Sequence, residues 1–291
     1  MKEKVLYVKL PEGAQYRKVI VAEDGMIGIA YSEECTCQQK EKAKVEIPKP
    51  KALVGGDEVY QNDDVPYWYC KIKNGRDTFM HVYMEDLTEE DLLYDSKTGK
   101  KRKFSTKRQK KYKKDALEAL ANKPKEGFRW IAVYEPSPTP NGSVQFVEDE
   151  IPLVGLSCPE WDKMLKEYSP ENESAKISKT TYFLLSLRWL KDGFATLEQL
   201  ADHSEEIGHY RDSENPKHDF EKTGERKFGG VYGFVGNTCI IVEDPNSESG
   251  SSLLGGGYNN YGDTYPFADV GRIGHPNGDN NGIVGWLELK K

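Results

Sequence analysis

The densest group of side chains that could carry out chemistry lies between residues 203 and 219. Histidines and acids, the usual nitrogen and oxygen ligands of metal ions, recur there at short intervals: His203, Glu205, Glu206, His209, Asp212, His218 and Asp219. Glu206-x-x-His209 resembles one half of the motif that holds di-metal carboxylate centres. One hypothesis is therefore a metal-dependent hydrolase or nuclease that uses this cluster.

Two observations argue against a metal centre in this stretch. The second half of a di-metal motif is absent from the sequence. Leu197, Leu200 and Ile207 recur at helical spacing, so we expect them to form a buried stripe and most of the polar groups to face solvent. The chain also lacks a Gly-x-Ser-x-Gly elbow, a P-loop and a His-Glu-x-x-His pair. We therefore predict no catalytic residues, no bound metal and no cofactor.

The five cysteines are odd in number and irregularly spaced: Cys35, Cys37, Cys70, Cys158 and Cys239. They make a poor disulfide framework, and no second Cys or His pair completes a zinc site, so we predict free thiols and a reducing compartment. The first residues, MKEKVLYVKLPEG, lack the apolar centre of a signal peptide, and no run approaches the roughly 18 apolar residues of a membrane span. We expect synthesis in the cytoplasm without membrane insertion, which is compatible with assembly into a virus particle.

Near the C-terminus the sequence becomes rich in Tyr, Asn, Asp and Gly. The candidate ligand-binding residues there are Tyr258, Asn259, Asn260, Tyr261, Asp263, Tyr265, His275, Asn277, Asp279, Asn280 and Asn281. Tyrosine offers broad contact area at low entropic cost, and Asn and Asp offer adaptable hydrogen bonds, as in antibody paratopes. Tight turns also favour Asn, Asp and Gly, so a purely structural role is the alternative.

Hydrophobic periodicity and turn signals predict the elements that position these residues. We expect strands at 5–10, 16–22, 26–32, 66–73, 78–84, 128–135, 144–155, 231–236, 239–244 and 282–290, and Asn74-Gly75-Arg76-Asp77 should join the fourth and fifth of these as a hairpin. We expect helices at 86–93, 115–123, 160–167, 181–192 and 196–210, with Gly193 ending the fourth and a Thr196-to-Gln199 capping pattern starting the fifth. These elements indicate an α+β protein of two domains. Residues 1–120 would form a β-rich module for attachment or assembly that ends in a basic linker or helix, and residues 125–291 would bind the ligand.

Positive charge is concentrated in one block. Residues 97–114 hold eleven Lys or Arg and no acid, although the whole chain carries a net charge of −7. Such a block could grip phosphates. The interpretation that we favour is a basic helix start or a solvated connector that docks on an acidic neighbour, so nucleic acid is not an expected partner.

The order of segments after Thr180 resembles a known family. It runs L-x-W-L (187–190), G-F-A-T-L-E-Q-L (193–200), G-V-Y-G-F-V-G-N-T (230–238), L-G-G-G-Y-N-N (254–260), Arg272, and the closing N-N-G-I-V-G-W-L-E-L (280–289). This order is similar to the C-type-lectin-like domain of the formylglycine-generating (sulfatase-modifying-factor) type. The same variant occurs in the variable proteins that retroelements diversify in phages and bacteria.

Within that family the resemblance implies a binding protein rather than an enzyme. The enzymes hold copper with a pair of cysteines in the C-terminal region, whereas no cysteine follows Cys239 here. The variable proteins carry randomised residues on their final loops and strands, and adenine mutation of Asn codons gives mainly Asn, Tyr, Asp, His, Ser, Thr and Gly. The candidate residues between Tyr258 and Asn281 belong to this set. Asp244-Pro245-Asn246 and residues 277–281 could offer oxygen to calcium, but the Glu-Pro-Asn and Trp-Asn-Asp motifs of calcium-dependent lectins are absent.

We therefore expect a C-type-lectin-like fold whose Tyr/Asn-rich C-terminal loops bind a ligand without catalysis. The expected partners are a protein or glycan receptor on a cell surface, as for phage receptor-binding proteins, and further copies of the chain, because oligomers gain avidity. Val284, Trp286 and Leu289 should pack inward as the scaffold of this surface.

Overall fold

The computed structural model describes residues 16–21, 27–31, 47–62, 64–124, 128–210, 221–225, 227–256, 266–267 and 283–290. The chain forms two compact units, Met1–Ile47 and Pro48–Lys291. In the first unit, β1 (Tyr16–Val21) and β2 (Ile27–Tyr31) pair as an antiparallel hairpin. Both strands agree with the prediction, and the strand expected at 5–10 lies outside the described residues.

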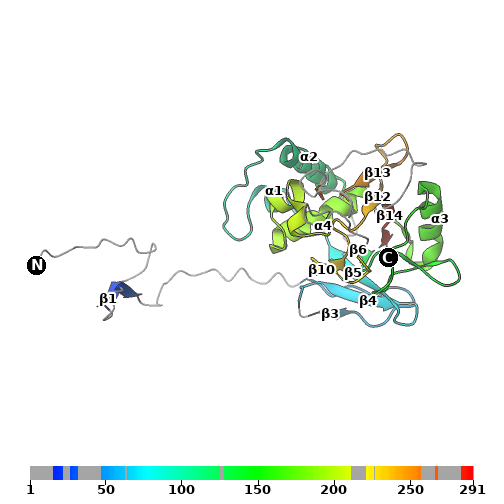
Figure 1. Ribbon diagram of the computed structural model, residues 1–291, viewed down its shortest axis with the longest axis horizontal. Helices are drawn as coiled ribbons and strands as arrows, with labels where there is room; N and C mark the ends of the chain where they lie inside the picture. Colours follow the sequence, from blue (N-terminus) through cyan, green and yellow to red (C-terminus); the bar gives the residue numbers. More distant parts are fainter. Residues whose placement is uncertain are drawn as a thin grey trace, which may run out of the picture. The chain divides into compact units, whose positions relative to one another are not determined.

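A six-stranded antiparallel sheet organises the second unit (Figure 1). Its strands, in spatial order, are β3 (Tyr60–Gln61), β4 (Trp68–Ile72), β5 (Asp77–Tyr83), β6 (Phe128–Ala132), β15 (Leu287–Leu289) and β9 (Ala175–Lys176). The C-terminal β15 lies between β6 and β9, with Leu289 opposite Trp130 and Leu287 opposite Lys176. Strands from before and after residue 120 therefore share one sheet, and the division that we predicted at residues 120–125 lies inside this unit.

The turn between β4 and β5 follows from its residues. Ile72 pairs with Asp77, and between them Lys73, Asn74 and Gly75 have φ angles of 55°, 60° and 77°. Glycine adopts this left-handed conformation without strain, and asparagine tolerates it better than most residues. The Asn-Gly pair thus sets the turn, and the predicted hairpin is confirmed.

Helix α4 (Lys179–Asp192) lies at the centre of the unit. Every residue from Thr181 to Leu190 is buried, as expected for a helix that is largely apolar on all sides. Ser178 caps its start by accepting a hydrogen bond from Thr181 N, and Gly193, with a φ of 79°, ends it in the left-handed conformation. The predicted stop at Gly193 is confirmed.

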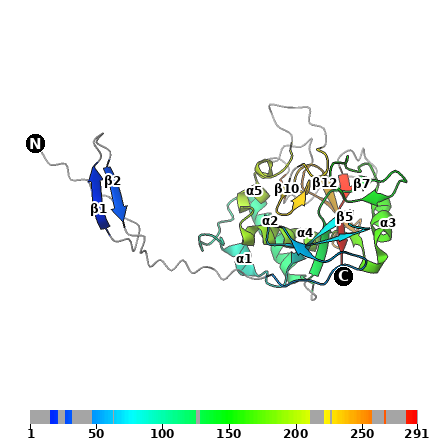
Figure 2. The ribbon, with the colours of Figure 1, turned by 90° about the horizontal axis from the view of Figure 1, so that it is seen from below.

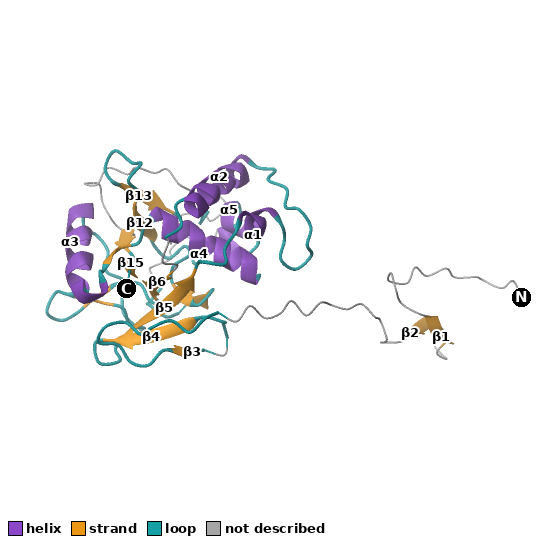
Figure 3. Ribbon diagram, turned by 180° about the vertical axis from the view of Figure 1, so that it is seen from behind, coloured by secondary structure: helices purple, strands orange, loops and turns teal. Residues whose placement is uncertain are grey.

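The strands separate one helix from the other four (Figures 2 and 3). Helices α1 (Glu89–Leu93), α2 (Lys107–Ala121) and α5 (Leu197–Ala201) gather around α4, and α3 (Cys158–Tyr168) lies on the other side. Helix α2 begins within the basic block, so the predicted basic helix start is confirmed. It packs on α4, where the hydroxyl oxygens of Tyr112 and Ser186 are 2.9 Å apart. None of the helices in these ranges combines the length and apolar character that a membrane span requires.

Helix α5 begins as predicted and ends early. Thr196 and Gln199 form the predicted capping box. Beyond the helix, Ser204 Oγ donates to the carbonyl oxygen of Gln199 at 2.7 Å, which favours a 3₁₀ turn. Gly208 then passes so close to Val235 that a Cβ atom would lie 2.5 Å from the Val235 carbonyl oxygen. The prediction of one continuous helix to residue 210 is therefore wrong.

A second sheet has the order β13 (Ser251–Leu254), β12 (Cys239–Glu243), β14 (Ile283–Gly285). Strand β12 is antiparallel to β13 and parallel to β14. Trp286 connects β14 to β15 and donates its indole N–H to the carbonyl oxygen of Ala132 at 3.0 Å, so the end of the chain joins both sheets. Val284, Trp286 and Leu289 are buried, as predicted. The short elements are β7 (Ser137–Pro138), β8 (Val144–Gln145), β10 (Lys227–Phe228), β11 (Val231–Tyr232), η1 (Pro170–Asn172) and η2 (Ser204–Glu206).

Two predicted strands are much shorter than expected. The strand at 144–155 is limited to β8, and Asp149 beyond it has a φ of 65°. The strand at 231–236 is limited to β11, because Gly233 and Gly236 have φ angles of 70° and 86° that no extended strand contains. A prediction from apolar content alone therefore made both strands too long.

Candidate functional site

All eleven candidate ligand-binding residues lie outside the described part of the chain: Tyr258, Asn259, Asn260, Tyr261, Asp263, Tyr265, His275, Asn277, Asp279, Asn280 and Asn281. The structure does describe where their segment joins the core. Strand β13 ends at Leu254, β14 begins at Ile283, and Pro266 and Phe267 lie between them. Because β13 and β14 flank β12, both ends of the segment start from one sheet.

Phe267 anchors the middle of this segment to α4. Its ring is 1% exposed and stacks on Tyr182 with the ring centroids 4.4 Å apart. Tyr182 Oη donates to the carbonyl oxygen of Phe267 at 2.9 Å, and Phe267 N donates to Ser204 Oγ at 2.7 Å. Burial raises the pKa of Tyr182 well above its usual value, so the hydroxyl remains a donor. The segment is thus fixed to a buried helix at a point between residues 257–265 and 268–282.

The sequence analysis missed this anchor. A signal was present, because Phe267 is the only phenylalanine after residue 254 in a stretch otherwise rich in Tyr and Asn. Its partner Tyr182 lies 85 residues away in sequence, and no local pattern links the two.

The predicted cluster of histidines and acids does not form one site among the described residues. His203, Glu205 and Glu206 are exposed, and His203 Nδ1 lies 3.2 Å from Glu205. His209 is instead 7% exposed, and its Nδ1 lies 2.8 Å from Glu221, an acid that the sequence analysis did not consider. Its predicted place on a solvated helix face is wrong, because the chain leaves the helix before it. Asp212, His218 and Asp219 lie outside the described residues. Within the described ranges, no three His, Cys, Asp or Glu side chains come together as metal ligands would.

In the Asp244-Pro245-Asn246 turn, the carboxylate oxygen atoms of Asp244 already accept hydrogen bonds from nearby protein groups. Asp244 is buried, and its carboxylate accepts hydrogen bonds from Asn246 N at 3.1 Å and from Ser252 Oγ at 2.8 Å. Lys179 Nζ lies 3.4 Å from the same carboxylate. A protein cation already occupies the place that calcium would need, so this stretch is a poor calcium ligand set.

A buried carboxyl group that the sequence analysis also missed supports the segment from Gly229 to Thr238. Glu135 is fully buried and accepts hydrogen bonds from Asn237 Nδ2 at 2.7 Å and Thr238 Oγ1 at 2.9 Å. Burial raises its pKa to about 8, although these two hydrogen bonds act in the opposite direction. Gly233 covers it so closely that a Cβ atom would lie 2.2 Å from a carboxyl oxygen. Because it is enclosed, Glu135 stabilises the segment rather than meeting a ligand.

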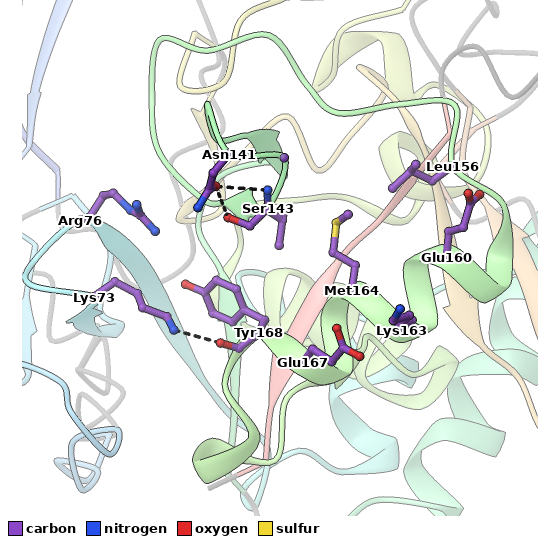
Figure 4. A pocket seen from close by; sticks show the side chains of 12 residues that line it. Lys73, Arg76, Asn141, Ser143, Leu156, Glu160, Lys163, Met164, Glu167 and Tyr168 are labelled. Carbon is purple, nitrogen blue, oxygen red and sulfur yellow. Dashed lines mark hydrogen bonds between the residues drawn. The ribbon is translucent and has the colours of Figure 1, made fainter.

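An open cleft of about 620 Å³ lies between α3, the β4–β5 turn and the β7–β8 hairpin (Figure 4). Its lining residues are Lys73, Arg76, Asn141, Gly142, Ser143, Val144, Leu156, Glu160, Lys163, Met164, Glu167 and Tyr168. Charged side chains of both signs and an apolar floor share this lining, so the cleft suits a small polar ligand.

Charged groups on two sides of the cleft face one another. Lys73 Nζ donates to the carbonyl oxygen of Tyr168 at 3.0 Å, and Arg76 forms a pair with Asp77 through Nε at 3.1 Å. Across from them, Glu160 and Glu167 project from α3 (Figure 4). Among the described lining residues there is no histidine or cysteine, and the hydroxyl of Ser143 donates to Asn141, which cannot act as a base. These described residues therefore do not form an activated nucleophile.

Neither the sequence nor the structure leads to a known relative. No protein-family model, curated protein or solved structure matches this chain. The structure shows a mixed α+β protein, in agreement with the predicted class.

Proposed function

We propose that this chain is a non-catalytic receptor-binding protein. The unit Pro48–Lys291, in which residues 125–291 hold the resembling segments, would carry a C-type-lectin-like fold, and residues 258–265 and 275–281 would contact a protein or glycan on a cell surface. The observation that carries the proposal is the anchor at Phe267, which attaches the middle of the Tyr/Asn-rich segment to the buried helix α4. A binding segment held at both ends and in the middle loses less conformational entropy when a ligand orders it.

The packing of the motif segments supports the lectin-type assignment. Trp189, from the L-x-W-L segment, donates its indole N–H to the carbonyl oxygen of Gly229 at 3.0 Å and packs edge-on against Phe234. Phe234, from the G-V-Y-G-F-V-G-N-T segment, packs edge-on against Trp286 of the closing segment, with centroids 4.6 Å apart. Segments distant in sequence thus contribute to one aromatic core, as a shared fold would require.

Several side chains that could act in catalysis are instead buried and bonded to neighbouring residues, which supports binding over catalysis. The carboxyl groups of Asp244 and Glu135 and the imidazole of His209 are each buried and held by neighbouring side chains. Cys70, Cys158 and Cys239 are free thiols, and the other two cysteines lie outside the described residues. The described part of the chain therefore offers no thiol pair of the kind that the enzymes of the resembling family use.

The test is a binding measurement on intact cells. Fluorescently labelled protein is titrated onto a panel of bacterial and animal cells, before and after periodate oxidation of surface glycans or digestion of surface proteins. We expect saturable binding to at least one cell type and its loss after one of the two treatments, which identifies the receptor class. Absence of saturable binding throughout the panel would contradict the proposal.

The hydrolase alternative makes a different prediction. It requires a stoichiometric metal in the purified protein, together with a hydrolytic activity that His203→Ala and His209→Ala abolish. We expect neither. That pair of results would replace the binding proposal.

A further inference from the structure

Helix α2 carries two opposite faces. Gln109, Tyr112, Ala116 and Ala119 are buried on the side that packs against α4. The exposed side holds five cationic residues: Lys107, Arg108, Lys110, Lys111 and Lys114. At 3.6 residues per turn, four of these, the lysines, fall on one side of the helix, away from the buried stripe. Figures 1 and 3 place α2 at the outer margin of the helical group.

This charge pattern is unfavourable for the helix itself. Cations near a helix N-terminus oppose the helix dipole, and like charges three or four residues apart repel one another. Lys107 and Arg108 occupy the first turn of α2, which contains no acid. The first turns of α1, α3 and α5 contain acids, among them Glu89, Glu160 and Glu198, whereas the first turn of α4 contains none. The basic block at the start of α2 therefore does not stabilise this helix through its dipole.

The loop before α2 extends the same surface. Lys97, Lys100, Lys101 and Lys103 are exposed on it. Arg102 turns inward instead, and its guanidinium donates to the carbonyl oxygens of Asp91 and Leu92 at 2.5 and 3.2 Å. This inward contact holds the loop to α1, so the neighbouring lysines are presented from a fixed backbone. We call the exposed cations of the loop and of α2 the basic face.

The residue types of the basic face indicate which class of anionic partner it could bind. Its apolar side is already packed on α4, so the helix has no free apolar stripe to insert into a lipid surface. Of the two aromatic residues within 97–114, Tyr112 is buried and Phe104 lies beneath Lys113, whose Nζ is 5.2 Å from the ring centroid, so neither ring is offered for stacking on unpaired bases. Lysine predominates, and lysine contacts phosphate as a point charge without the paired geometry that reads bases.

We propose that the basic face binds the phosphate backbone of double-stranded DNA without reading its sequence. From Lys107 to Lys114 the helix rises about 10 Å, a length of duplex axis that carries about six phosphate charges. The four exposed lysines on this side of α2 would therefore meet a length of duplex that carries more negative charges than there are lysines. This proposal departs from the sequence-based expectation of a solvated connector, and it is independent of the receptor proposed for residues 258–281.

The test uses the full chain and a fluorescently labelled duplex of about 24 base pairs, followed by anisotropy at several NaCl concentrations from about 50 to 200 mM. We expect the logarithm of the association constant to fall linearly with the logarithm of the salt concentration, with a slope of about −4. The triple variant Lys107→Gln, Lys110→Gln, Lys114→Gln should make this slope shallower by about 2.7 and weaken binding by about tenfold or more at the lowest salt.

The matched control removes the same number of positive charges from surface positions outside the basic face. Lys49, Lys51 and Lys166 are exposed outside the basic face, and their joint replacement by Gln should leave both the slope and the affinity unchanged. Thermal melts should show the α2 variant to be at least as stable as wild type, because it removes cations from a helix start. Three results would overturn the proposal: no duplex binding at the lowest salt, equal weakening by both triple variants, or stronger competition by polyglutamate than by unlabelled duplex, which would indicate an acidic protein partner.

Discussion

Two glycine-rich segments of this protein have similar compositions, and the structure describes more of the first than of the second. In Gly229–Thr238, the Asn237 side chain accepts from Glu221 N at 3.0 Å and donates to the Glu135 carboxyl and to the Glu221 carbonyl oxygen, so its hydrogen-bonding groups are used inside the fold. In residues 257–282, the contacts that the structure describes come from Phe267, which packs on Tyr182. Both segments thus contain glycine, asparagine and aromatic residues. Whether such a segment is part of the core depends on the residues that its side chains contact.

The largest effect should come from breaking the first segment at Phe234. Its ring is 2% exposed and contacts Tyr182, Trp189 and Trp286. Phe234→Ala should lower the free energy of unfolding by about 3–5 kcal/mol, measured by urea denaturation. Phe104→Ala, at a partly exposed position before α2, should cost much less. Equal losses would mean that the Phe234 cluster is not the core of the unit.

A smaller loss should follow removal of the polar clamp in the same segment. Asn237→Ala removes one of the two hydrogen bonds that Glu135 accepts and the side-chain partner of the Glu221 backbone N–H, which should cost about 1–3 kcal/mol in the same measurement. The matched control is Asn246→Ala, because Asn246 bonds Glu118 on the exposed surface. A cost no larger than that of Asn246→Ala would contradict the assignment of Asn237 to the core.

The clamp should also make stability depend on pH. The pKa of Glu135 is raised by burial from 4.5 to about 8 in the folded state. The folded protein therefore keeps a proton that the unfolded chain releases between these values, and the free energy of unfolding should fall as the pH rises from about 5 to 8, by up to about 1.4 kcal/mol per pH unit. Glu135→Gln, which stays neutral, should flatten this fall in urea titrations at each pH. An identical pH dependence in wild type and variant would show that Glu135 is ionised in the fold.

The smallest stability effect, and the most selective one, is expected at the anchor of the second segment. Tyr182→Phe keeps the ring stack and removes one hydrogen bond to Phe267, which should cost about 0.5–1.5 kcal/mol and weaken receptor binding. Tyr112→Phe removes a comparable buried hydrogen bond to Ser186 and serves as the control. It should cost about the same stability and leave binding unchanged. Equal effects of both variants on binding would contradict the role of the anchor.

Local sequence signals predicted the elements that depend on neighbouring residues. The Asn74-Gly75 turn and the stop at Gly193 depend on residues that readily adopt the left-handed conformation. The Thr196 cap depends on hydrogen bonds to Gln199, three residues further along the chain. Such contacts are visible in sequence because their spacing is fixed by the backbone.

Contacts between distant residues could not be predicted in the same way. Glu135 and Asn237 are 102 residues apart, and neither lies in a pattern that names the other. The insertion of β15 between β6 and β9 depends likewise on tertiary pairing, which is why the predicted boundary at 120–125 lies inside one unit. The candidate site was proposed from composition, and only its attachment at Phe267 is defined by described contacts.

The most direct test of the central claim measures affinity and stability together in a variant of the second segment. Tyr258, Tyr261 and Tyr265 are replaced by Ser, and Tyr94→Ser, at a position that is 42% exposed, is the control. If these tyrosines serve a ligand, binding to receptor-bearing cells should weaken at least about tenfold in the triple variant only, while the free energy of unfolding changes by less than about 0.5 kcal/mol. Unchanged affinity, or a loss of stability like that of Asn237→Ala, would instead assign the tyrosines to the fold.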